Sequence, residues 1–129
     1  MKQRILVVDD DQLVADTLSL IYEANGFEAR ACYSAAEGLE HARSFAPALV
    51  LCDVSMPDES GLVLAEQVNR EMPECEVLML TAYSSNQVSV LLHSMRMQRP
   101  LKLLAKPCPP DELLRETRAL LPNPAPAAA

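Results

Sequence analysis

Four short apolar runs recur along the chain, and each is followed at once by a residue that can bind phosphate or a metal ion. Runs of this length are typical of strands buried on both faces of a parallel sheet. Because parallel strands end at the same edge of a sheet, the four polar groups are predicted to meet. The runs are 5–8 before Asp9, Asp10 and Asp11; 49–52 before Asp53; 77–80 before Thr81; and 103–105 before Lys106.

Amphipathic segments separate these runs and predict helices. Leu13, Leu20 and Ile21 recur at helical spacing before Gly26, which predicts a helix that ends near this glycine. Ser34 is a typical N-cap residue for a second helix. The predicted strands are 5–8, 27–32, 48–53, 76–80 and 101–104, and the predicted helices are 12–24, 35–45, 61–72, 86–95 and 111–121.

The alternation of strands and helices predicts a single α/β domain built from five β-α units. Alternating units of this kind imply a parallel sheet, and their crossover connections are right-handed in ~98% of cases. We expect a doubly wound five-stranded sheet of order 2-1-3-4-5, with ligands bound where strands 1 and 3 are neighbours. The domain is expected to span 1–121, and the Pro/Ala-rich residues 122–129 are expected to form a tail or linker.

Composition and charge restrict the compartment and the ligands. The net charge of -7 argues against nucleic acid as a direct ligand, because phosphate contacts need a basic surface. No stretch approaches the ~20 apolar residues of a membrane span, and the first residues do not resemble a signal peptide. We therefore expect a cytoplasmic protein without a membrane partner. The four cysteines lack metal-binding spacing and are interpreted as free structural thiols.

The charge is unevenly distributed along the chain. Residues 77–110 contain no acid and four basic residues, Arg96, Arg99, Lys102 and Lys106, whereas the rest of the chain is strongly acidic. Two interpretations remain open for this basic segment. It is either a solvated helix face or a docking surface for an acidic partner.

Asp9, Asp10 and Asp11 are three consecutive acids at the end of the first predicted strand. One acid, Asp10 or Asp11, is enough to cap the helix that follows. Clustered carboxylates repel one another and raise one another's pKa unless a cation lies among them, so the cluster indicates a metal site. Mg²⁺, or Mn²⁺ in its place, suits such oxygen ligands together with a phosphate oxygen.

The predicted strand order brings Asp53 into the same pocket as Asp9 and Asp10. Thr81 and Lys106 would flank this pocket, where a hydroxyl and an ammonium can hold the oxygens of a phosphoryl group attached to Asp53. Taken alone, Thr81 is more often an N-cap or a strand residue, and Lys106 is more often a surface lysine. The combination, rather than either residue, predicts phosphate chemistry.

These motifs together resemble the receiver domains of two-component response regulators, which have a flavodoxin-like fold similar to that of the chemotaxis regulators. The resemblance implies a signalling domain, not an enzyme, that receives a phosphoryl group from a histidine kinase, a phosphotransfer protein or a small phosphodonor. The motifs that carry it are Asp9-Asp10, Asp53-Val54-Ser55-Met56-Pro57 followed by Gly61, Thr81-Ala82, and Lys106-Pro107.

The resemblance also implies a role for each site residue. Asp53 would be the phosphoacceptor. The metal ion would be held by Asp10, Asp53 and the backbone carbonyl of Ser55, with Asp9 in support. Thr81 would act as the switch that contacts the phosphoryl group, Lys106 would pair with that group, and the bond from Lys106 to Pro107 would be cis.

The chain departs from the family pattern in its C-terminal third. Leu103 stands where receivers usually carry tyrosine or phenylalanine, and the segment from Thr81 to Lys106 is longer than usual. We still expect phosphorylation to alter the face formed by 86–95, 101–104 and 111–121. This face is predicted to bind an output domain, a partner protein or a second copy of the chain.

Two other functions remain as alternatives. The spacing of Asp9 and Asp11 matches the nucleophile and general acid of small phosphohydrolases similar to haloacid dehalogenases, although Asp53 would then have no role. The departure at Leu103 favours a different alternative, a module that has kept the receiver fold and binds partners without phosphorylation.

Overall fold

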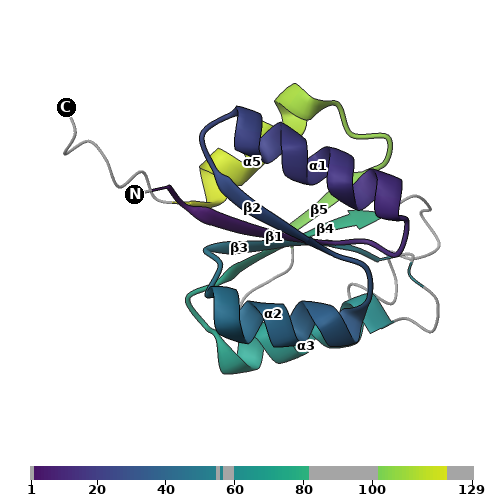
Figure 1. The fold of residues 1–129 in the computed structure, drawn as a ribbon, viewed down its shortest axis with the longest axis vertical. Helices are drawn as coiled ribbons and strands as arrows, with labels where there is room; N and C mark the ends of the chain where they lie inside the picture. Colours follow the sequence, from purple (N-terminus) through teal and green to yellow (C-terminus); the bar gives the residue numbers. More distant parts are fainter. Residues whose placement is uncertain (1, 55, 57–59, 82–101, 122–129) are drawn as a thin grey trace.

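The computed structural model describes residues 2–54, 56, 60–81 and 102–121, and its strands and helices alternate as the sequence predicts (Figure 1). The predicted helix over 86–95, Ser55 and the tail 122–129 lie outside the described residues. The elements are β1 (Arg4–Val8), α1 (Gln12–Ala24), β2 (Glu28–Cys32), α2 (Ala35–Phe45), β3 (Leu49–Asp53), α3 (Ser60–Glu71), β4 (Glu76–Thr81), β5 (Lys102–Ala105) and α5 (Pro110–Leu120).

The strands form one parallel sheet of order β2-β1-β3-β4-β5, which confirms the predicted topology. In this order β1 and β3 are neighbours, and Val8 is paired with Cys52. Asp9 and Asp53 are therefore the next residues along two adjacent strands. On the other side of β3, Asp53 is paired with Leu80 of β4, so the ends of β3 and β4 also lie side by side.

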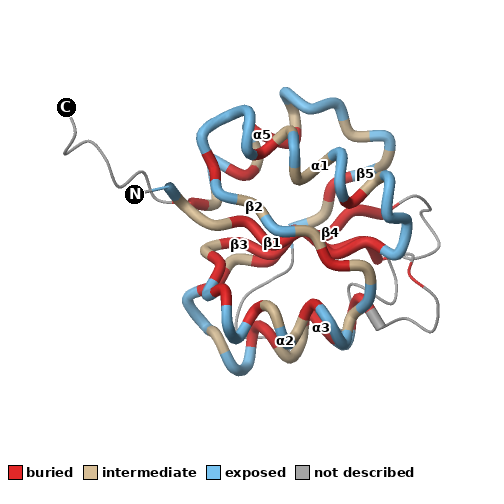
Figure 2. Tube along the Cα trace, in the orientation of Figure 1, coloured by how far each residue is buried: buried red, intermediate tan, exposed pale blue. Residues whose placement is uncertain are grey.

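Helices cover both faces of the sheet, α1 and α5 on one face and α2 and α3 on the other (Figure 1). The strands β1, β3 and β4 are buried along almost their whole length, as their apolar runs predict (Figure 2). The same prediction is wrong for β5, where Lys102 and Ala105 are exposed. This strand lies at the edge of the sheet, so its apolar run is only partly covered.

The bounds predicted for α1 are correct, and Ile21 packs against the core, but the other two apolar residues that predicted this helix do not. Leu13 and Leu20 are 76% and 65% exposed, whereas Ala15 and Tyr22 are fully buried. The Tyr22 hydroxyl lies 2.8 Å from the Thr117 hydroxyl of α5, so a buried hydrogen bond joins the two helices. The packed face of α1 thus consists of Ala15 and Tyr22, with the partly buried Leu18 and Ile21 beside them.

Two expectations about the whole chain can be compared with the described residues. All four cysteines are free thiols, as expected, and Cys32, Cys52 and Cys75 are buried. Within the described ranges, no helix combines the length and the apolar character needed to cross a bilayer.

Candidate functional site

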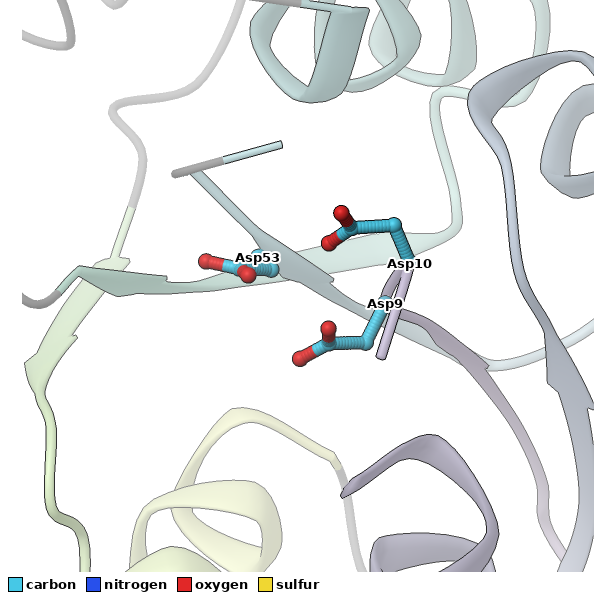
Figure 3. Close-up of side chains that lie close together, drawn as sticks. All are labelled: Asp9, Asp10 and Asp53. Carbon is cyan, nitrogen blue, oxygen red and sulfur yellow. The ribbon is translucent and has the colours of Figure 1, made fainter. Parts of the chain in front are cut away.

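Three carboxylates meet at the carboxyl edge of the sheet. Asp9 and Asp10 follow β1, Asp53 is the last residue of β3, and one carboxylate oxygen from each lies within 4.8 Å of the other two (Figure 3). Asp9 and Asp53 are buried, with 2% and 5% of their surface exposed, whereas Asp10 is exposed. The cluster thus lies at the centre of the sheet edge and reaches solvent at Asp10.

Lys106 lies over the two buried carboxylates. Its Nζ is 3.1 Å from Asp53 Oδ2 and 3.5 Å from Asp9 Oδ2. The backbone N–H of Lys106 donates to the Thr81 carbonyl at 2.8 Å, which ties the end of β5 to the end of β4. The bond from Lys106 to Pro107 is cis, as the resemblance implies. The sequence prediction that Lys106 belongs to this site is consistent with these distances.

The hydrogen bonds of Asp9 leave one of its oxygens without a donor. Asp9 Oδ1 accepts a hydrogen bond from the Asp11 backbone N–H at 2.9 Å. Among the described residues, Asp9 Oδ2 is the buried side-chain oxygen that accepts no hydrogen bond, although the Lys106 ammonium lies nearby. Three ionised carboxylates and one ammonium carry a net formal charge of about -2. An unsatisfied oxygen within such a cluster fits a divalent cation.

The electrostatics of the cluster follow from burial and from these short distances. Burial raises the pKa of Asp9, and the negative charges of Asp53 and Asp10 raise it further, while the Asp11 amide and Lys106 counteract them. Burial alone would lower the pKa of Lys106, but its hydrogen bond and ion pairs with Asp53 and Asp9 outweigh burial and raise it. Lys106 therefore stays charged beside carboxylates that repel one another.

The other predicted residues occupy distinct positions. Thr81 is buried at the end of β4, which lies between β3 and β5, so it shares the edge with Asp53 and Lys106. Asp11 is the N-cap of α1, and its side chain accepts hydrogen bonds from Leu13 N–H and Val14 N–H at 3.1 and 3.3 Å. Asp11 is therefore engaged at the helix start and is not part of the carboxylate cluster.

The sequence did not assign a role in the site to Cys52 or Gly61. The Cys52 thiol lies 3.7 Å from the Asp53 carbonyl oxygen and 3.7 Å from the Gly61 carbonyl oxygen. Gly61 is in the first turn of α3, where alanine would be the better helix former. The sequence signal for Gly61 was its place in the receiver motif, at a helix start where glycine costs stability. The structure adds that its φ is not positive.

The strand β5, in which the chain departs from the usual receiver pattern, lies beside the site. Leu103 is half-buried and packs against the core between the sheet and α2 and α3, so a leucine side chain takes the place of an aromatic ring. Lys102 forms an ion pair with Glu116 of α5 at 3.2 Å. Two of the four basic residues of the acid-free segment, Lys102 and Lys106, therefore pair within the domain. Arg96 and Arg99 lie outside the described residues.

Comparisons with known proteins agree with this architecture. The chain is 33% identical over 121 residues to the DNA-binding response regulator MtrA of Mycolicibacterium paratuberculosis, covering 94% of this chain and 52% of MtrA. It therefore spans about half the length of the curated relatives that it matches. The CheY-like receiver domain protein of Methanospirillum hungatei superposes with a TM-score of 0.80 at 30% identity, over 92% of this chain and 93% of the other.

A second solved structure is similar over its whole length. The response regulator TrrA of Thermotoga maritima, in complex with Mg(2+)-BeF, has a TM-score of 0.79 and 29% identity, and covers 92% of this chain and 99% of its own. The strand order and the acidic cluster at the switch point define the class, a doubly wound α/β domain with clustered carboxylates at the carboxyl edge of its sheet.

Within that class the family is now clear. The sequence pattern of the response regulator receiver domain matches residues 5–118, nearly the whole chain. The chain belongs to this family and is a phosphoacceptor signalling domain of a two-component system.

Proposed function

We propose that Asp53 is the residue that receives the phosphoryl group, from a histidine kinase, a phosphotransfer protein or a small phosphodonor. The observation that carries this proposal is the contact between Asp53 and Lys106 inside the carboxylate cluster. Asp53 is the carboxylate at the end of the central strand β3, with its own ammonium partner at 3.1 Å. An aspartate held in this way can act as a nucleophile toward an anionic phosphodonor.

A divalent metal ion completes the proposed site. Asp10, Asp53 and the Ser55 carbonyl would hold Mg²⁺ or Mn²⁺, with Asp9 in support, and the unsatisfied Oδ2 of Asp9 together with the net negative charge supports this assignment. When bound, the ion offsets the negative charges of the carboxylates and of the phosphoryl oxygens. The similar TrrA structure contains Mg(2+)-BeF, which also supports a metal ion here.

Asp53, Lys106 and Thr81 have different roles in the proposed phosphoryl transfer. One carboxylate oxygen of Asp53 forms a bond to phosphorus while the bond from phosphorus to the donor nitrogen or oxygen breaks. The leaving group departs with the electrons of that bond. The Lys106 ammonium group stabilises the negative charge of the phosphoryl oxygens, and the Thr81 hydroxyl contacts the same oxygens. The domain thus assists its own phosphorylation and dephosphorylation without turning over a separate substrate.

Phosphorylation is proposed to shift a population between two packings of the domain. Thr81 and Lys106 are joined through their backbones, so a movement at β4 reaches β5 and Leu103 directly. We propose that the face formed by 86–95, β5 and α5 then binds an output domain, a partner protein or a second copy. Because the chain spans about half of its relatives, this output remains a proposal for the whole protein.

The cytoplasm is the proposed location. Buried free thiols at Cys32, Cys52 and Cys75 suit a reducing compartment, and no described residue pair forms a disulfide. Histidine kinase domains and phosphotransfer proteins would meet the domain there.

The alternatives are weighed by two observations. The phosphohydrolase would need Asp11 as its general acid, but the Asp11 carboxylate caps α1 and lies outside the cluster. The half-buried Leu103 favours the phosphorylation-independent module, because it provides no aromatic ring to change exposure.

One experiment separates the three functions. The protein is incubated with phosphoramidate or acetyl phosphate and Mg²⁺, and its intact mass is measured over time. A single phosphoryl adduct that is absent in Asp53→Asn supports the receiver function. No adduct with any donor identifies the interaction module, and steady turnover that depends on Asp9 identifies the hydrolase.

A further inference from the structure

The first turn of α3 touches the backbone of the proposed phosphoacceptor. A Cβ built on Gly61 would lie well inside 3.0 Å of the Asp53 carbonyl oxygen, a separation that real Cβ atoms essentially never show. The same Cβ would lie 3.4 Å from the Asp53 carbonyl carbon and 3.4 Å from Cys52 Sγ. Gly61 has no positive φ, so close approach, not backbone conformation, requires glycine here.

Cys52 makes a second link at the same place. Its side chain is fully buried, and its thiol lies 3.7 Å from both the Asp53 and the Gly61 carbonyl oxygens. The thiol can therefore act as a weak hydrogen-bond donor to these carbonyl oxygens. The end of β3 and the first turn of α3 are thus in contact through backbone atoms and through one buried thiol.

The peptide that leaves Asp53 is held on its other side by the sheet. The Val54 backbone N–H donates to the Leu80 carbonyl of β4 at 2.8 Å. Asp53 therefore lies between β4 and the Gly61 turn, and its carboxylate projects to Lys106 at 3.1 Å. Because the direction of a side chain follows its backbone, a shift of this peptide would move the carboxylate relative to Lys106 and Asp9.

We propose that Gly61 is a positioning residue for phosphoryl transfer, because its missing side chain lets α3 lie against the backbone of Asp53. The inference rests on the proposed role of Asp53 and adds a requirement that this role does not itself contain. In an ordinary helix position alanine is preferred to glycine. At position 61 a methyl group forces either the helix outward or the Asp53 peptide out of place.

The chain contains a matched control for this substitution. Gly38 lies in α2 and is also buried, and a Cβ there would meet Leu64 Cδ2 and Val8 Cγ2, both at 3.0 Å. Those atoms are side-chain methyl groups, which need to give by only a few tenths of an ångström, whereas the atom opposite Gly61 belongs to the backbone. Gly38→Ala therefore adds a methyl group to the same core, with milder crowding and without pressing on Asp53.

The test compares the parent protein, Gly61→Ala and Gly38→Ala. Phosphorylation by phosphoramidate is followed by intact mass at several Mg²⁺ concentrations, which gives a maximal rate and a half-saturating Mg²⁺ concentration for each protein. Urea unfolding of the same samples gives their stabilities. We expect Gly61→Ala to lower the maximal rate by about 10- to 100-fold and to raise the half-saturating concentration, as a displacement on the order of 1 Å would.

Gly38→Ala is expected to keep both kinetic values within about twofold of the parent, even if its stability falls as far as that of Gly61→Ala. The inference is overturned if Gly61→Ala retains the parental maximal rate, or if both variants slow in proportion to their loss of stability. Should Gly61→Ala fail to fold, Cys52→Ala replaces it. A rate at least about threefold below the parent then supports the inference, and the parental rate overturns it.

The proposed function fails in a different way. If the parent itself acquires no adduct, or if Asp53→Asn still acquires one, the role of Asp53 is wrong and the inference falls with it. If the parent is phosphorylated at Asp53 and Gly61→Ala matches it, only the positioning role is wrong.

Discussion

The carboxylate cluster is expected to make the metal-free domain less stable than it could be, and Asp9→Asn tests this directly. Asp9 is almost fully buried, its Oδ2 accepts no hydrogen bond, and its pKa is raised above the ordinary value of 3.8. Asparagine keeps the shape and an oxygen that can accept the Asp11 N–H, but it removes the buried charge. We therefore expect Asp9→Asn to be more stable than the parent in EDTA at neutral pH.

The magnitude follows from the distances. At an effective dielectric constant of about 20, the repulsion of two charges within 4.8 Å is at least about 3.5 kcal/mol, and the attraction at 3.5 Å is about 4.7 kcal/mol. The repulsion by Asp53 and the attraction by Lys106 thus nearly cancel, and exposed Asp10 adds about 1 kcal/mol of repulsion through water. The free-energy cost of burying the Asp9 charge is therefore not offset by these interactions, and Asp9→Asn removes it. We expect a gain of about 1–3 kcal/mol, or roughly 3–10 °C in Tm.

The pH dependence has a definite sign. Because the pKa of Asp9 is higher in the folded protein than in the unfolded chain, the folded protein binds more protons between the two values. The penalty is fully present above the folded pKa and is relieved as the pH falls through it. The stability gap between Asp9→Asn and the parent should therefore be widest at neutral pH and should close toward pH 3.8.

The assay is urea unfolding of both proteins in EDTA across this pH range, followed by the same series in Mg²⁺. Asp11→Asn is the matched control, since it removes one exposed charge and keeps an equally good N-cap, with an expected change within about 0.5 kcal/mol. Mg²⁺ should stabilise the parent more than Asp9→Asn, because only the parent retains the whole cluster. If Asp9→Asn is no more stable than the parent in EDTA, or if the stability gap does not depend on pH, the buried Asp9 charge does not destabilise the metal-free domain.

Three further predictions concern single contacts. Lys106→Met should slow phosphorylation by phosphoramidate about 10²- to 10³-fold, measured as adduct formation, because it removes the positive charge beside Asp53; an unchanged rate would exclude Lys106 from the site. Tyr22→Phe should lower the unfolding free energy by about 1–2 kcal/mol in urea, because the buried Thr117 hydroxyl loses its partner at 2.8 Å. Gly26→Ala should cost about 1 kcal/mol in the same assay, since the φ of 96° at this position is strained for any residue with a side chain.

The fold was predictable because the apolar runs of β1, β3 and β4 are continuous and short. Every boundary in the described elements lies within one residue of its predicted position. The convergence of Asp9, Asp10, Asp53 and Lys106 was predictable for the same reason, because parallel strands present their carboxyl ends at one edge. The individual roles implied for these residues and for Thr81 remain predictions.

Three features could not be predicted from local pattern. Leu13 and Leu20 of α1 are exposed, whereas Ala15 and Tyr22 are fully buried, and Tyr22 is joined to α5 by a hydrogen bond. The apolar run of β5 resembles a central strand, and its exposure follows only from its place at the edge. The approach of Gly61 to the Asp53 carbonyl depends on how closely a helix lies against a strand. Each of these depends on tertiary packing that the spacing of residues does not encode.

The most direct test of the central claim is to identify the residue that carries the phosphoryl group. The protein is treated with phosphoramidate and Mg²⁺, any acyl phosphate is reduced with borohydride, and the digested peptides are sequenced by mass spectrometry. We predict that Asp53, and no other aspartate, is converted to homoserine. Conversion at Asp9 instead, or no conversion under conditions in which a known receiver domain is labelled, would contradict it.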